Sequence, residues 1–194
     1  MSPVPTDVID EIASVPPELG AVRRRRPDVR EYAQKYFESI FAPVDDSQFS
    51  VADRWLVAAF ATRLTADDQT AEFYARRARE ASPAAEAVLT AAEQSLWSGP
   101  FGHYAEPGLA SENTEGLRLL AVEIAGIEPR LAAALAHAHL LTYRLRETDA
   151  ASHDLLQDAG WSTDGIVTLS QLLAFLAFQQ RVIASLTVLK EVFA

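Results

Sequence analysis

The feature that most constrains the fold is an apolar stretch near the C-terminus, "LLAFLAFQQRVIASL" at residues 172–186, in which one of fifteen residues is charged. A membrane-spanning helix needs about 20 mostly apolar residues. This stretch is shorter and contains two glutamines and a serine. A soluble helix that is apolar on several faces is normally covered by other helices or by another subunit. The stretch therefore predicts a buried or interfacial helix and no membrane partner.

The rest of the chain also indicates helices. Of the 194 residues, 8 are glycine, alanine is abundant, and valine and isoleucine rarely alternate with polar residues, so helix is favoured over sheet. We expect an all-α fold, a single domain over residues 1–194 with about nine helices. Caps, prolines and glycines place these helices at 7–14 (capped by Thr6), 27–40, after Ser50, 66–79, 83–97, 112–125, 130–146, 149–159 and 163–190.

The charge excludes one class of partner. The formal net charge is −10, so the chain repels phosphate backbones and we expect no nucleic-acid partner. The basic run "RRRR" at 23–26 goes against this trend, and we interpret it as a solvated helix end or an ion-paired interface, with a nucleic-acid arm as the weaker alternative. The N-terminus has acidic residues and no long apolar run, which is unlike a signal peptide. We expect a cytoplasmic protein.

The chain has no cysteine. Disulfides, thiolate metal sites and cysteine nucleophiles are therefore excluded. The four histidines are scattered and no phosphate loop or metal-binding motif is present. The sequence predicts no metal site and no cofactor.

Two stretches carry a family resemblance. Residues 155–186, "LLQDAGWSTDGIVTLSQLLAFLAFQQRVIASL", give a short helix, Ala-Gly, and a long helix with a late arginine. Together with residues 49–78, "FSVADRWLVAAFATRLTADDQTAEFYARRA", they resemble the alkylhydroperoxidase D-like, or carboxymuconolactone decarboxylase, superfamily, and in particular its peroxidase-related members. The resemblance implies an alkylhydroperoxidase D-like helical core over residues 49–190, preceded by an N-terminal helical extension over residues 1–48.

The resemblance also implies where the family's chemistry would lie. Peroxidase members carry Cys-x-x-Cys-x-x-x-His on the second helix of this region, with two sulfurs one turn apart and a histidine to relay a proton. In this chain the best gapless placement puts Asp67, Thr70 and Tyr74 at those positions. None of the three can do thiol chemistry. In the decarboxylase branch, the resemblance implies a glutamate followed one turn later on the same helix by a histidine. In this chain Glu72 is followed one turn later by Arg76.

Histidines supply other candidates. His137 and His139 lie two residues apart and project about 200° apart on a helix, so they do not share one metal ion. His139 and Tyr143 share a face, as a proton-relay pair or, the interpretation we favour, as a core histidine beside an aromatic ring. His103, in the glycine-rich loop 98–110, is a candidate general base or an exposed loop residue.

Arg181 is the single charge in the apolar stretch, and a buried arginine requires a partner. Glu123, Asp53 or a neighbouring subunit are the candidates, and an anion-binding pocket is the alternative. Because the apolar residues fall on several faces of the helix, we expect a homo-oligomer formed through it. The residues on which this expectation rests are Leu172, Phe175, Leu176, Phe178 and Leu186.

Two hypotheses for the function follow. In the first, the chain is a family member without the redox cysteines, with no thiol peroxidase activity and with a small-molecule-binding or structural role. In the second, it is a non-thiol acid/base enzyme, lactone decarboxylase-like or other, that uses a pocket containing His103, His139, Tyr74 or Glu123.

Overall fold

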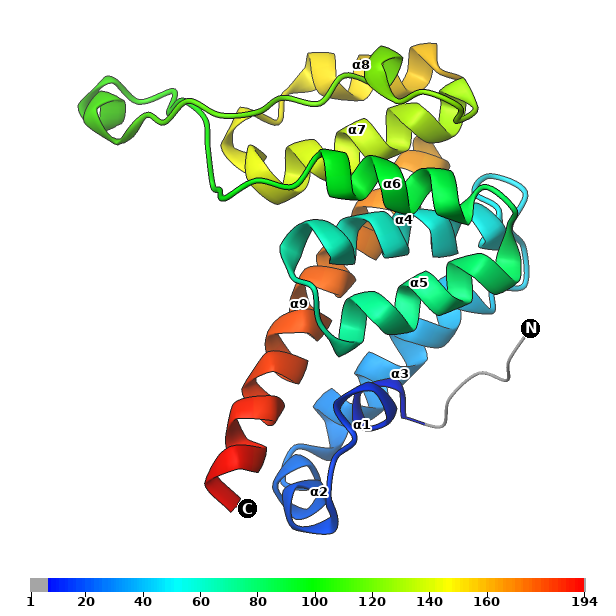
Figure 1. The fold of residues 1–194 in the computed structure, drawn as a ribbon, viewed down its shortest axis with the longest axis vertical. Helices are drawn as coiled ribbons and strands as arrows, with labels where there is room; N and C mark the ends of the chain where they lie inside the picture. The colour runs from blue at the N-terminus through cyan, green and yellow to red at the C-terminus, as the bar shows by residue number, and fades with distance from the viewer. Residues whose placement is uncertain (1–6, 194) are drawn as a thin grey trace.

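The computed structural model describes residues 7–193, and within them it contains nine α-helices, three short 3-10 helices and no strand. The expected all-α class is confirmed. Figure 1 shows α6, α7 and α8 at one end of the molecule, α1 and α2 at the other, and α9 running between them. The α-helices are α1 (Val8–Ala13), α2 (Pro17–Arg23), α3 (Pro27–Phe41), α4 (Val51–Thr65), α5 (Gln69–Ala81), α6 (Ala85–Gln94), α7 (Pro129–Tyr143), α8 (Ala150–Asp158) and α9 (Thr163–Phe193).

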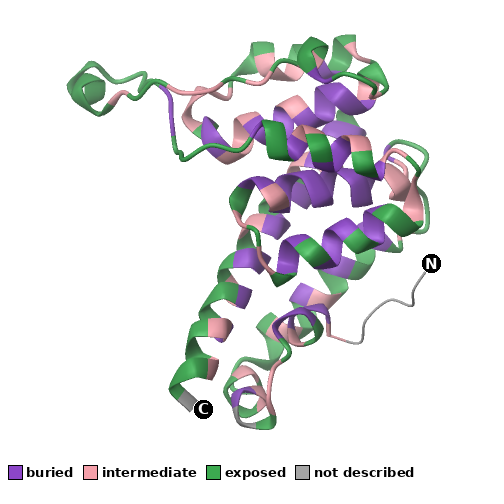
Figure 2. Ribbon diagram, viewed as in Figure 1, coloured by how far each residue is buried: buried purple, intermediate pink, exposed green. Residues whose placement is uncertain are grey.

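Helix α4 is the centre of the fold. Ser50 caps it, its hydroxyl accepting a hydrogen bond from the Asp53 amide at 3.1 Å, as the sequence predicts. Ten of its fifteen residues are buried, because α5, α6, α7 and α9 all pack against it. Figure 2 shows that the buried residues concentrate around this helix.

An aromatic cluster fills the space between α3, α4, α5 and α9. The Phe37 ring is fully buried. Its centroid lies 4.9 Å from that of Phe41, 6.1 Å from Trp55 and 6.4 Å from Phe175. Phe41 stacks on Trp55 at 3.9 Å. These rings join α3, which belongs to the N-terminal 48 residues, to the helices that follow.

Ion pairs hold the first three helices together. The carboxylates of Asp7 and Asp10 on one side face the guanidinium groups of Arg23 and Arg30 on the other. Arg23 is the first residue of the basic run and ends α2. The expected ion-paired interface is confirmed for Arg23, while Arg24–Arg26 are exposed, as in the alternative of a solvated helix end. Helix α2 was not expected from the sequence. Thr6, the expected cap of α1, lies outside the described residues, and Asp7 is the N-cap.

Most of the apolar stretch on α9 is covered by the chain itself. Leu172, Phe175, Leu176 and Leu186 are all buried, whereas Phe178 is 40% exposed. The expectation that these residues need another subunit to cover them is therefore wrong for four of the five. By length and composition α9 also meets the criterion for a membrane span, although 44% of the tested window is buried inside the molecule. Core helices of soluble proteins meet the same criterion, so this is weak evidence for a membrane.

The expected helix at 112–125 is wrong. Two 3-10 helices, η1 (Pro107–Glu112) and η2 (Ala121–Glu123), flank an irregular segment there. Its contacts are with distant residues: Thr114 bridges Gly102, and the carbonyl of Gly116 accepts a hydrogen bond from Arg144. A Cβ atom on Gly116 would lie 2.3 Å from the ring of Phe101. Tertiary packing therefore overrides the local helix signals, and residues 102–114 form an arm that projects from the body (Figure 1).

Other helix boundaries differ by a few residues from those expected. Helix α6 ends at Gln94 instead of Trp97, and α5 begins at Gln69 because Asp68 is its N-cap. Helix α7 ends at Tyr143, and a 3-10 helix, η3 (Leu145–Glu147), follows it. Helix α8 is capped by Asp149 instead of Thr148.

We predict that Phe37→Ala lowers the free energy of unfolding by about 3–5 kcal/mol, because it removes a fully buried ring and leaves a cavity. Chemical denaturation measures the difference. Ser39→Ala, at an exposed position of the same helix, should change stability by less than about 0.5 kcal/mol. Equal effects of the two substitutions would contradict the central place of the aromatic cluster.

Candidate functional site

Thr70 and Tyr74, two of the three positions that match the family motif, point into the core between α5 and α9. Both are fully buried. The Tyr74 hydroxyl donates a hydrogen bond to Oε1 of Gln179 at 2.6 Å, and burial raises the pKa of Tyr74. Asp67 lies before α5, is exposed, and pairs with Arg63. The structure thus brings Thr70 and Tyr74 to one buried face and leaves Asp67 at the surface.

The polar groups around Tyr74 are uncharged and closely packed. Gln180 donates from Nε2 to the carbonyl of Thr62 at 3.1 Å, and the Thr62 hydroxyl donates to Ala58. The Thr70 hydroxyl and Nε2 of Gln179 have no hydrogen-bond partner. These side chains hold no proton that titrates near neutral pH. The arrangement can orient α5 against α9, and it offers neither a nucleophile nor a base.

His139 and Tyr143 lie side by side on α7, as their spacing predicts. Their ring centroids are 5.0 Å apart in an edge-to-face arrangement. The Tyr143 hydroxyl donates to the carbonyl of Leu64 at 2.6 Å and accepts from the amide of Trp97 at 3.3 Å. His139 is 1% exposed, and burial lowers its pKa although a hydrogen bond to the Ser95 backbone opposes the shift. These contacts agree with a core histidine beside an aromatic ring.

His137 faces the other way on α7. Its ring centroid lies 5.8 Å from that of His153 on α8, so the two histidines of α7 have separate surroundings, as expected from their spacing. His137 is buried, and its Nε2 atom has no hydrogen-bond partner. Burial, reinforced by the nearby His153, lowers the pKa of His137 to about 4. His137 is therefore neutral at pH 7.

His103 lies at the base of the projecting arm, two residues after Phe101, whose amide donates to the carbonyl of Tyr143. Its Nε2 atom is 2.7 Å from Oε1 of Glu115, and both side chains are more than half exposed. The amide of His103 donates to Glu147, which also pairs with Arg144 and Arg118. The hydrogen bonds from Arg144 hold the pKa of Glu147 down at about 2. This ion cluster fixes the base of the arm and leaves His103 open to solvent.

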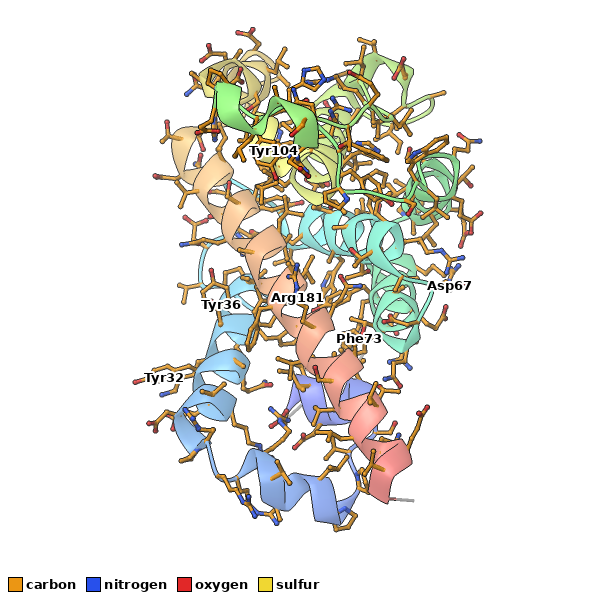
Figure 3. All side chains as sticks on the ribbon, turned by 90° about the vertical axis from the view of Figure 1, so that its left-hand side faces the viewer. Tyr32, Tyr36, Asp67, Phe73, Tyr104 and Arg181 are labelled. Atoms are coloured by element: carbon orange, nitrogen blue, oxygen red, sulfur yellow. The ribbon has the colours of Figure 1, made fainter. Side chains whose placement is uncertain are left out.

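The expected ion pair of Arg181 is not formed. Arg181 is exposed, and Nη1 donates to the carbonyl of Ala177, one turn back on the same helix. Glu123 is exposed in η2, where its carboxylate accepts a hydrogen bond from the amide of Leu120. Asp53 lies 3.9 Å from Arg130 instead. The prediction is wrong for Glu123 and Asp53, because Arg181 occupies the exposed outer face of α9 (Figure 3). A partner from a neighbouring subunit stays a prediction.

Two surface hollows lie away from all these residues. One, of about 410 Å³, is lined by charged residues of α3 together with Asp7 and Arg24. The other is an apolar groove of about 460 Å³ between α3 and α9, which we call the α3/α9 groove. It is lined by Asp28, Val29, Tyr32, Ala33, Tyr36, Ala174, Phe175 and Phe178. Within residues 7–193, no group of three or more histidine, aspartate or glutamate side chains is placed to hold a metal ion.

Comparisons with protein-family models, with curated proteins and with solved structures give no match to this chain. The resemblance of residues 49–78 and 155–186 therefore enters the function as a proposal. The Tyr74–Gln179 contact is the feature that sequence reasoning missed, since it joins residues 105 positions apart. Gln179 and its neighbour Gln180 stood out as polar residues in an apolar stretch, and that was the available signal.

We predict that Tyr74→Phe lowers the free energy of unfolding by about 1–3 kcal/mol, because it leaves the buried amide of Gln179 without its hydrogen bond. The double variant Tyr74→Phe/Gln179→Leu should recover most of this loss, because neither side chain of the pair then leaves a buried polar group unpaired. Thermal unfolding of the three proteins measures the effect. A double variant no more stable than Tyr74→Phe would show that the contact has no such role.

We predict that the free energy of unfolding falls by about 3 kcal/mol as pH drops from about 6.5 to about 4. In this range His137 binds a proton in the unfolded state but not in the folded state, where its pKa is lowered to about 4. This contribution is complete above pH 6.5 and is lost as the pH approaches 4. His139 acts in the same direction. The carboxylates of Asp7 and Glu147, whose pKa values are lowered, lose their contribution at more acidic pH.

His137→Leu should flatten this dependence, since it removes the titrating group. Urea unfolding at a series of pH values measures the slope. Gln157→Leu, at an exposed position of the neighbouring helix α8, replaces a side chain that does not titrate, so it is the matched control and should leave the slope unchanged. The same slope in wild type and His137→Leu would rule out the assignment.

Proposed function

We propose that this chain is a cysteine-free relative of the alkylhydroperoxidase D-like proteins, without thiol peroxidase activity, and that it has a structural role. The observation that carries the proposal is the packing of Thr70 and Tyr74. These are two of the positions at which the family's redox motif would lie, and both are fully buried, with the Tyr74 hydroxyl bonded to Gln179. A buried uncharged contact replaces the reactive groups.

The packing also favours a structural role over the binding of a small molecule at these positions. A ligand site is a concave cavity with a few convergent polar groups. Here the polar groups that converge, Tyr74, Gln179 and Thr70, have no exposed surface. The two hollows described above lie elsewhere, along α3. Small-molecule binding would have to use the surface and not the family's motif positions.

The second candidate is a non-thiol acid/base enzyme, and one observation favours it. Nε2 of His139 has no hydrogen-bond partner, and the lowered pKa keeps the ring neutral, as a general base requires. The other residues of this hypothesis do not join it. The Tyr143 hydroxyl is hydrogen-bonded to backbone groups. His103 is on the arm, and Glu123 is at the surface. A base that is 1% exposed reaches a substrate only if the fold opens.

We predict that the purified protein consumes hydrogen peroxide or an organic hydroperoxide, in the presence of a dithiol donor, at the rate of the uncatalysed reaction. The physical reason is the absence of any cysteine, since the thiolate is the nucleophile of this chemistry. Donor oxidation followed by absorbance measures the rate. A cysteine-dependent peroxidase in the same assay is the positive control, and turnover by this chain that survives repeated purification would refute the proposal.

The enzyme candidate is tested by the reactivity of the histidines with diethyl pyrocarbonate. If the core stays closed, His103 and His153 are modified quickly while His137 and His139, both buried, react at least about tenfold more slowly. Peptide mass spectrometry assigns the sites. Rapid modification of His139 would show that reagents reach it and would favour the acid/base enzyme over the structural role.

A further inference from the structure

Helix α9 carries a continuous exposed stripe with a regular spacing. Eight residues, separated alternately by four and three positions, are all exposed in the described chain. We call them the α9 stripe: Val167, Gln171, Ala174, Phe178, Arg181, Ser185, Val188 and Val192. This 3–4 alternation is the spacing with which one helix packs along another at a shallow angle. The stripe is about 38 Å long at 1.5 Å per residue.

The stripe contains large apolar side chains that the described chain covers only in part. Phe178 is 40% exposed and Val192 is 74% exposed. Phe178 also lines the α3/α9 groove, whose other wall includes Tyr32, 68% exposed, and Tyr36. Figure 3 shows α9 toward the viewer, with Tyr32 and Tyr36 on the neighbouring α3. An uncovered apolar surface of this extent indicates an interaction site.

The spacing between successive stripe residues is the same when it is counted from either end of the helix. When two copies of α9 lie antiparallel about a two-fold axis between Phe178 and Arg181, each stripe position faces a stripe position of the other copy. The pairs are Val167 with Val192, Gln171 with Val188, Ala174 with Ser185, and Phe178 with Arg181. Val167 and Val192 form an apolar pair at each end, and Ala174 and Ser185 form a pair of small residues, whereas Gln171 faces Val188.

The charges at the centre are complementary in this arrangement. Arg181 has no carboxylate partner within residues 7–193, and Asp28, on the rim of the α3/α9 groove, has no cationic partner there. Arg181 of a second copy would lie over Phe178, where a guanidinium is attracted to the ring face. Because Phe178 and Asp28 line the same groove, that guanidinium also comes within reach of Asp28. Two-fold symmetry makes each of these contacts twice.

We propose that the α9 stripe and the α3/α9 groove form a two-fold docking surface for a second copy of this chain, with the two α9 helices antiparallel. The stripe is one helix wide, on the order of 400 Å², whereas a stable dimer buries about 800 Å² per partner. The side chains of α3 that line the groove, Val29, Tyr32 and Tyr36 among them, add to the contact. The surface lies outside the buried positions on which the proposed function rests, so either proposal can fail without the other.

A membrane surface is the competing occupant, and the stripe fits it less well. Gln171, Arg181 and Ser185 interrupt the apolar residues of the stripe, and polar groups are costly in lipid. The net charge of −10 also repels an anionic bilayer. A second copy offers partners to the same polar groups. The experiments below separate the two occupants.

Engineered cysteines test the register directly, because the chain contains no other cysteine. We predict that Ala174→Cys mixed with Ser185→Cys gives a disulfide-linked dimer after mild oxidation, seen by non-reducing electrophoresis. Each single variant alone should stay monomeric on the gel, since position 174 faces position 185 and not itself. Both substitutions are at exposed positions and should leave the fold intact, which circular dichroism checks. Self-linking of either variant, or no linking in the mixture, would overturn the antiparallel register.

Oligomeric state and a charge swap complete the test. Light scattering after size exclusion should give twice the chain mass of 21.2 kDa, and Phe178→Asp should give the monomer. Arg181→Asp and Asp28→Arg should each weaken the dimer roughly tenfold or more, and the double variant should restore it. A monomeric wild type, or a dimer indifferent to Phe178→Asp, overturns the proposal. So does a monomer that sediments with anionic phosphatidylserine vesicles and loses this binding in Phe178→Asp, which would assign the surface to a membrane.

Discussion

The burial of α4 over most of its length is the constraint on which the rest of the structure depends. From Arg54 to Leu64 every residue except Arg63 is buried, so α4 has no face that can meet water. A helix of this kind must be covered on all sides, and α5, α6, α7 and α9 do so. Arg54 adds hydrogen bonds to this packing, because its guanidinium donates to the carbonyls of Phe49 and Ile40. The buried guanidinium of Arg54 therefore links the end of α3 to α4.

Much of this architecture could be predicted from the sequence, because local signals decide it. Ser50 and Pro129 start helices where expected, and α9 covers the long apolar stretch. Local signals failed where distant contacts decide the outcome. Residues 112–125 contain a helix-like pattern, but the backbone there is bonded to Gly102 and Arg144. Helix α2 was missed because it has few periodic apolar residues and is held by ion pairs to α1.

The candidate site shows a sharper limit of sequence reasoning. The helical spacing of Thr70 and Tyr74 is enough to place them on one face, and the structure places both inside the core. It is not enough to find Gln179, whose contact depends on how α5 and α9 cross. The error over Arg181 has a related cause. Counting charges along a stretch says how apolar a helix is, but only the positions of its neighbours say which face is covered.

Helix α9 combines both kinds of surface on one element. Its inner face includes Leu169, Leu172 and Ile183, all with no exposed surface, and this face is accounted for by the core. The opposite face carries four large apolar side chains, Val167, Phe178, Val188 and Val192, that are 40–74% exposed. Packing within one copy leaves this surface open to water. A second copy of α9 is the partner that we propose for it, because the same residues would then be covered on both chains at once.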